Sequence, residues 1–544
     1  MKNLALQRIA CALFLCVTIF AVADDDHDKD HHHHEDLTET QLGTVHFPVS
    51  CADSVQKPFA RGVALLHSFW YEEAEKEFLD IAKDDPHCAM AHWGIAMSLW
   101  HQLWDAPDEK VLARGRNEVK TGQKLAKHAT PREQAYLAAA SAFYKPKKLK
   151  HADRAKAYSD AMKKVYESNP NDHEAATFYA LSLIASEPDN DKDYATRKQA
   201  AAILEKVFAT EPDHPGVAHY LIHTYDRPEL AQLGIPAARR YAQIAPAAPH
   251  ALHMPSHIFA RVGLWQDDIN SNIASIDATR KTAAMGMGGA DHQFHAMDFL
   301  VYAYLQSGRE ADAQRVIDEI KAMPSMKNMH GMDFDERLAS QVRFEASYVL
   351  ELHDWKEAAS LAPIKDADND YNGVIYLTRA LGAARSGQIA EARKEVDNIK
   401  AIAQSYRDKK RMGYAKFFDR QVGEAQAWIS HSEGKDDEAI KTLRAIADEE
   451  KEGFSETGFL PAQELLGDLL MEAKRPQEAL VEYQTDLKVN PNRFDSLYGA
   501  AQAAQQAGKQ KEASDYYAQL VKSCEGGSST RAELTRAKEL LAKK

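Results

Sequence analysis

Apolar residues recur every three to four positions from about Pro58 onward, which is the period of helices that bury one face. No alternating apolar and polar run typical of a strand interrupts this period. One spacing repeats within it: alanine, a large apolar residue four positions later, and proline eight positions after that. Alanine lets two helices approach closely, the large residue fills the groove between them, and proline ends the second helix. The pattern therefore predicts an all-α chain of antiparallel helix pairs, with this spacing at Ala74/Phe78/Pro86, Ala200/Leu204/Pro212, Ala237/Tyr241/Pro249 and Ala479/Tyr483/Pro491.

The last two units, at about 460–493 and 494–525, carry the pattern most fully, as in "AQELLGDLLMEAKRPQEALVEYQTDLKVNPN". These residues resemble the tetratricopeptide repeat (TPR) family. The resemblance covers about 58–525 and implies a right-handed superhelical solenoid of about eleven or twelve pairs, whose first helices line a concave ligand face. Segments such as "HPGVAHYLIHTYD" and "HALHMPSHIFARVGLW" look similar to exported bacterial TPR proteins, a resemblance that implies architecture and no particular activity.

Histidines gather in the central units, whereas other units carry different residues at the equivalent positions. Three neighbouring first helices can be aligned on their turn glycines and on a shared spacing of four residues between histidines. This alignment predicts two rows of side chains across the concave face. The rows are His219, His253 and Asp298, and His223, His257 and Tyr302, with His250 and His295 flanking them and Asp226 one turn further along.

Imidazoles four residues apart on a helix are a common chelating pair for transition metals, and a carboxylate can complete the ligand set. We therefore predict a site for Zn, Cu, Fe or Mn, with His219, His223, His253, His257 and Asp298 as ligands. Two other interpretations stay open. The histidines could form a hydrogen-bonded polar groove without an ion, or they could join Arg261 in binding an acidic or C-terminal carboxylate peptide.

No motif in the sequence argues for catalysis. The zinc-protease pattern HExxH is absent, because Tyr220 and Met254 occupy the position of its glutamate. Asp226 or Asp298 could serve a metal-bound water as a general base, which permits hydrolytic or oxidative chemistry without indicating it. We predict a binding or scaffold protein that is metal-associated and holds a protein or peptide in its groove. A metal-dependent enzyme and a metal-free protein-interaction scaffold are the alternatives.

Charge and the first residues suggest where the protein works. The formal net charge of −14 argues against nucleic-acid and anionic membrane partners. Residues 1–23 have a positive start, an apolar stretch and a small-x-small cleavage site after Ala23, so we predict a Sec-type signal peptide and a periplasmic or secreted protein. No later segment is apolar enough to span a bilayer. In an oxidising compartment Cys51 and Cys88 could form a disulfide, which leaves Cys524 buried near the C-terminal cap.

Composition divides the chain into successive regions. The tract at 24–36 could bind Zn, Ni or Cu loosely, or could serve only as a solubilising tail. The predicted regions are a signal peptide (1–23), a disordered acidic and His-rich segment (24–45), N-terminal repeats (46–210), central degenerate repeats with the histidine-lined groove (211–325), C-terminal repeats (326–525) and a capping helix (526–544).

Overall fold

A computed structural model describes residues 37–103, 106–145, 148–188, 190–287, 292–324, 335–365, 369–450 and 460–542 of the 544-residue chain. Within these ranges the chain is helical and contains no strand. Across the same residues, no helix is long and apolar enough to cross a membrane. The predicted signal peptide (1–23) and the His-rich tract at 24–36 lie outside the described residues.

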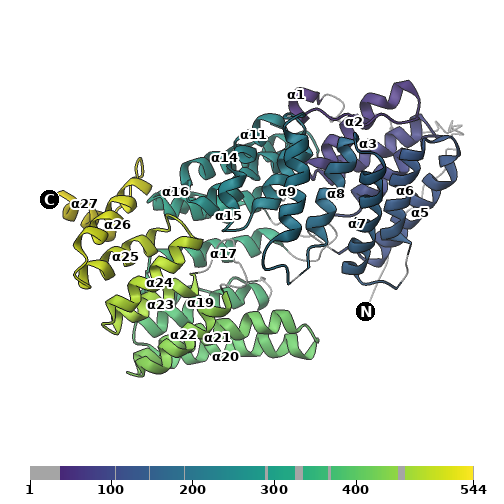
Figure 1. Ribbon diagram of the computed structural model, residues 1–544. Coiled ribbons are helices and arrows are strands. Elements are labelled where there is room, and N and C mark those ends of the chain that lie inside the picture. Colours follow the sequence, from purple (N-terminus) through teal and green to yellow (C-terminus); the bar gives the residue numbers. More distant parts are fainter. Residues whose placement is uncertain are drawn as a thin grey trace, which may run out of the picture.

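The helices pack in antiparallel pairs in chain order, which confirms the predicted all-α, TPR-like right-handed solenoid (Figure 1). The N-terminal pairs are α2 (Gln56–His67) with α3 (Tyr71–Asp84), α4 (Ala89–Ser98) with α5 (Glu109–Leu125), α6 (Pro131–Tyr144) with α7 (His151–Ser168), α8 (His173–Ala185) with α9 (Ala195–Phe208), and α10 (Pro215–Tyr225) with α11 (Ala231–Ile244).

The central pairs, together with α10 and α11 before them, contain the predicted histidine region. They are α12 (Pro249–His253) and α13 (Pro255–Val262) with α14 (Trp265–Ala284), and α15 (His292–Gln306) with α16 (Glu310–Ala322). The C-terminal pairs are α17 (Glu336–Glu351) with α18 (Trp355–Ser360), α19 (Asn369–Arg385) with α20 (Ile389–Asp408), α21 (Met412–Ser432) with α22 (Asp436–Glu450), α23 (Ala462–Glu472) with α24 (Pro476–Val489), and α25 (Phe494–Gln506) with α26 (Gln510–Ser523), which α27 (Ala532–Ala542) covers.

First helices of neighbouring pairs contact one another, as α8 does α10 and α17 does α19, so they form the inner layer of the solenoid. The second helices form the outer layer. A glycine in the left-handed conformation ends several first helices, because L-residues adopt that conformation only at a cost. Gly263, with φ of 67°, ends α13 in this way, and the amide of Leu264 then donates to the carbonyl of Phe259.

The N-terminal end of the solenoid closes onto its middle. Helix α2 contacts α10, and Gly216 of α10 leaves room for the ring of His67. The segment before α2 also packs inward, although we predicted disorder through residue 45. Residues 39–42 form α1 (Glu39–Leu42), and Leu42 and Val45 are buried, so apolar burial stabilises this part of the segment. Cys51 and Cys88 form a disulfide that joins the segment to the start of α4, and Cys524 is buried and free.

The C-terminal half closes onto the same region from the other side. The loop between α24 and α25 lies against the turn between α13 and α14, and Figure 1 shows the last helices curling back toward α16. The indole of Trp265 donates to the carbonyl of Asn492 at 3.0 Å. The amide of Phe494 donates to the side chain of Gln306 at 2.8 Å. Both closures meet near the central pairs, where the histidines lie.

Candidate metal centre

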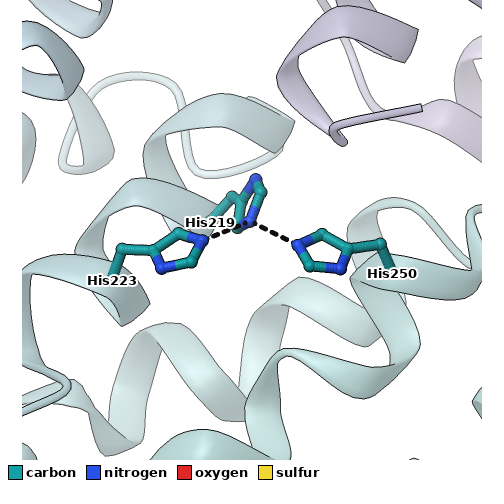
Figure 2. A group of neighbouring side chains, drawn as sticks. All are labelled: His219, His223 and His250. Atoms are coloured by element: carbon teal, nitrogen blue, oxygen red, sulfur yellow. Dashed lines mark hydrogen bonds between the residues drawn. The ribbon is translucent and has the colours of Figure 1, made fainter. Parts of the chain in front are cut away.

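Three histidine side chains from two neighbouring first helices converge in the centre of the solenoid (Figure 2). His219 and His223 lie one turn apart on α10, and His250 lies near the start of α12. The Nε2 atom of His219 is 3.1 Å from the Nε2 atoms of both His223 and His250. We call His219, His223 and His250 triad one.

A second group lies beside the first. His253 ends α12, His257 is on α13 and His295 is on α15. The Nε2 atoms of His253 and His257 are 3.1 Å apart, and the ligand atoms of all three residues lie within 4.8 Å of one another. We call these residues triad two. Its rings contact those of triad one, with centroids 6.3 Å apart for His250 and His253 and 6.5 Å apart for His223 and His257.

The structure groups the predicted residues differently from the two rows. The row alignment placed His250 on the flank of the site, but its ring completes triad one. Likewise, His295 completes triad two. Pro255 has no amide hydrogen and interrupts the helix, which separates α12 from α13. His250 belongs to triad one, and His253 and His257 belong to triad two, although their spacing suggests one face.

The carboxylate and phenol predicted for the rows lie elsewhere. Asp298 is buried, and its Oδ1 atom is 3.2 Å from the guanidinium of Arg343, outside both groups of converging ligand atoms. The hydroxyl of Tyr302 accepts a hydrogen bond from Arg493 at 3.2 Å. Asp226 lies behind triad two, where it accepts from the Nε atom of Arg261 at 2.7 Å and from His257.

Three of the histidines have an oxygen acceptor at the ring nitrogen that faces away from the centre. Nδ1 of His219 is 2.6 Å from the carbonyl oxygen of His67, and Nδ1 of His253 is 2.7 Å from Oδ1 of Asn272. Nδ1 of His257 is 3.1 Å from the carboxylate of Asp226. Because these oxygens only accept, each Nδ1 is assigned the proton, and each neutral ring presents the lone pair of Nε2 to the centre.

This assignment leaves lone pairs facing one another. His253 and His257 both present Nε2 acceptors, which cannot form a hydrogen bond with each other at 3.1 Å unless one ring gains a second proton. Burial, followed by the neighbouring histidines His295 and His257, holds the pKa of His253 well below its usual value. In triad one, burial also lowers the pKa of His219, and it lowers that of His223 to about 3. Burial therefore favours the neutral form of His219, His223 and His253, and lone pairs directed at one another in this way suit a cation.

A third histidine group in the same region shows the contrasting case. The carboxylate of Glu174 accepts from Nε2 of His67 at 2.8 Å and from Nε2 of His214 at 2.9 Å. The hydroxyl of Tyr220 donates to Nδ1 of His67, and the amide of Val217 donates to Nδ1 of His214. Every ring nitrogen in this group has a complementary partner without an ion. The Nε2 pair of His253 and His257 in triad two differs, because both rings have an oxygen acceptor at Nδ1.

Aromatic side chains enclose the two triads. Phe69, just after α2, packs against His219, His223 and His250, with ring centroids 4.4, 5.5 and 5.6 Å away. Phe299 of α15 packs against the rings of triad two, at 4.7 Å from His257. His219 is 0% exposed and His253 is 2% exposed, so these histidines do not line the open groove that we predicted. Curvature of the solenoid brings the end of α2 into that groove.

Solvent can reach the centre on one side. His295 is exposed and His223 is partly exposed. A separate small pocket of about 20 Å³ lies behind His257, with room for roughly one water molecule. It is lined by Asp226, His257, Ala260, Arg261, Trp265, Phe299, Tyr302, Val489 and Asn490.

Several residues that contact the triads or lie beside them were not predicted from the sequence. Asn272 belongs to a second helix, and Phe69 belongs to a turn, so neither occupies a position expected to face the groove. His67, Glu174 and His214 are scattered over 148 positions, and no local spacing connects them. His292 could have been found from its spacing, because it stands three residues before His295. Its ring centroid is 5.3 Å from that of His250.

No family model matches this chain, and no curated protein matches it either. Among solved structures, a monomeric mutant of IFIT1 with Gppp-AAAA is similar over 90% of this chain and 100% of that chain, at 12% identity and a TM-score of 0.35. The human IFIT1 dimer with m7Gppp-AAAA covers 84% of this chain and 94% of its own, at 11% identity and a TM-score of 0.33. Similarity this distant assigns no ligand, and our expectation that nucleic acid is not a partner stays a prediction.

Proposed function

We propose that this chain is a metal-binding helical-repeat protein and that its central histidines bind a transition-metal ion. The observation that carries the proposal is the convergence of Nε2 lone pairs whose Nδ1 protons are held by His67, Asn272 and Asp226. Hydrogen bonds of this kind fix the orientation and tautomer of histidine ligands in metal sites. The group of His67, Glu174 and His214 needs no ion, so burial of histidine alone does not create this pattern.

The spacing of the nitrogen atoms supports the same proposal. Two nitrogen ligands at 2.0–2.1 Å from one ion with tetrahedral geometry are about 3.3 Å apart. Three Nε2 pairs across the two triads are 3.1 Å apart, so small side-chain shifts would admit an ion. Zn, Cu, Fe and Mn were the ions expected from the sequence. Imidazole ligands suit zinc and copper well, whereas manganese favours oxygen ligands.

The contacts of Asp226 favour metal binding over metal-dependent hydrolysis. A general base must reach the water that it activates. Asp226 instead accepts hydrogen bonds from His257 and Arg261, and Arg261 holds its pKa well below the usual range against the effect of burial. The end of α2 fills the groove at the triads, so a protein or peptide partner would bind the solenoid elsewhere.

Export belongs to the proposal, because disulfides such as that between Cys51 and Cys88 persist mainly in oxidising compartments. N-terminal sequencing of the protein recovered from its native cell tests this part. A chain that begins at Asp24 would support export and cleavage after Ala23. An intact N-terminus would contradict it.

Elemental analysis of the purified protein tests the metal site. The histidines of the tract at 24–36 are first replaced by alanine in the full chain, so that loosely bound metal does not contribute. We expect at least one equivalent of a transition metal, lost in the double variant His253→Ala/His257→Ala. The matched control is His431→Ala, because His431 is bonded to Asp436 and Glu472 in the C-terminal repeats. Metal-free protein after reconstitution with Zn, Cu, Fe and Mn would end the proposal.

A further inference from the structure

The two triads are separate ligand sets of the same composition. Each brings three imidazoles together, and neither borrows a ligand from the other. His250 and His253 stand three residues apart on α12 yet belong to different triads, so one short helix contributes to both. Ring contacts of 6.3 and 6.5 Å between the triads place the two sets directly side by side.

We propose that the centre is dinuclear, with one copper ion on each triad, and that the two ions together bind dioxygen. This inference rests on the proposed metal-binding function and deepens it. Three protein ligands leave coordination positions open on each ion, as in sites where an external molecule completes the shell. Two ions held close together can share such a molecule.

The chemistry of the ligands favours copper. Both sets consist of neutral imidazole, and neither contains a carboxylate or a thiolate. The nearby carboxylates have other partners: Asp226 faces Arg261, and Asp298 faces Arg343. Among divalent first-row ions, copper binds nitrogen sites most tightly, and imidazole also suits copper. A neutral ligand set adds no negative charge, so it also accommodates the singly charged cuprous ion.

The surroundings fit a small, uncharged guest. Phe69 covers triad one and Phe299 covers triad two, which leaves apolar walls beside both ligand sets. His295 is exposed, so one ligand of triad two is in contact with solvent. In the proposed reaction, each of two cuprous ions gives one electron to dioxygen. The product is a peroxide dianion held between two cupric ions, no proton is transferred, and reversal releases dioxygen.

The test uses the full chain with the histidines of the 24–36 tract replaced by alanine, loaded with cuprous ion without oxygen. We expect two copper ions per chain. Exposure to air should then produce an intense near-ultraviolet charge-transfer band. The oxidised protein should give little electron paramagnetic resonance signal, because two bridged cupric ions couple their unpaired spins.

Variants that disable one triad make the result specific. His219→Ala disables triad one and His295→Ala disables triad two, and circular dichroism checks that both variants fold. We expect each to keep one copper ion, to lose the near-ultraviolet band and to show a cupric resonance signal after oxidation. His431→Ala should behave as the parent protein does, since His431 lies outside the centre.

Three outcomes would overturn the inference, and they are distinguishable. One copper ion per parent chain with a normal cupric signal would show a mononuclear site, and the proposed metal-binding function would stand. Two zinc ions bound in preference to copper would likewise remove the copper and dioxygen inference alone. No bound metal of any kind would remove the proposed function as well.

Discussion

At the scale of single residues, the hydrogen-bond partners of each imidazole ring determine whether the histidine can serve as a metal ligand. Glu174 accepts two protons and thereby makes His67 and His214 members of a closed hydrogen-bonded group. A carbonyl oxygen behind His219 and an amide oxygen behind His253 instead direct lone pairs inward. Residue identity alone does not reveal this difference, because all four side chains are buried histidines.

Asp226→Asn tests the role of the hydrogen-bond partners at the Nδ1 atoms. The substitution removes the charge that holds the Nδ1 proton of His257, so we expect metal affinity to fall by about 10–100-fold. Competition with a chromophoric chelator measures the change. Asp298→Asn is the matched comparison, because Asp298 was the carboxylate among the predicted ligands. A larger loss in Asp298→Asn than in Asp226→Asn would favour the original ligand assignment over the two triads.

Glu424 provides a pH test far from the histidines. Burial raises the pKa of this carboxyl from 4.5 to about 8, against the opposing effect of Arg420. Between these values the folded protein keeps a proton that the unfolded chain releases, so the free energy of unfolding should fall as pH rises from about 4.5 to about 8. Glu424→Gln should reduce that slope. Urea titrations at several pH values measure it, and an unchanged slope would contradict the assignment.

At the scale of elements, the sequence predicted the helices and their pairing because each depends on nearby residues. Apolar period, turn glycines and terminal prolines are local signals, and α25 with α26 follows them closely. The grouping of the histidines depends instead on how neighbouring helices shift along their axes. Pro255 also divides the expected helix into α12 and α13, which the predicted rows did not include.

Gly263→Ala tests the C-terminal closure. Gly263 adopts a φ of 67°, and an added Cβ would lie 2.3 Å from the carbonyl oxygen of Pro491. Gly387→Ala is the control, because Gly387 has a φ of 76° and nothing within 4 Å of the added carbon. The left-handed backbone should cost both variants about 1–2 kcal/mol. Gly263→Ala should be destabilised further in thermal unfolding, and equal losses would show that the contact contributes nothing.

At the scale of the whole molecule, both ends of the chain pack against the central pairs. Arg493, in the loop before α25, is fully buried and pairs with Glu351 at 2.9 Å and with Glu464 at 2.7 Å. Such closures could not be predicted from the sequence, because they depend on small rotations between pairs that accumulate along the solenoid. The repeat pattern predicts a concave face. The curvature of the solenoid determines which distant segments, such as the end of α2, pack into it.

Bound metal should stabilise the part of the molecule that surrounds the triads. A ligand that binds only the folded state at 100 times its Kd adds about 2.7 kcal/mol to the free energy of unfolding. We expect the melting temperature to rise with metal concentration in calorimetry, with no rise in His253→Ala/His257→Ala. Helices α19–α22 contribute no residue to either triad, so we expect them to gain little hydrogen-exchange protection. Equal protection along the whole chain would contradict a local site.

The position of Phe69 over triad one determines when the metal site becomes enclosed during folding. Phe69 stands 150 residues before His219 in the chain, and its backbone is held at a φ of 54°. The enclosure is therefore complete only after the central pairs have formed and α2 has packed against them. An ion on triad one should leave faster whenever this end of the chain unfolds locally, so its residence time should shorten as the N-terminal end opens more often.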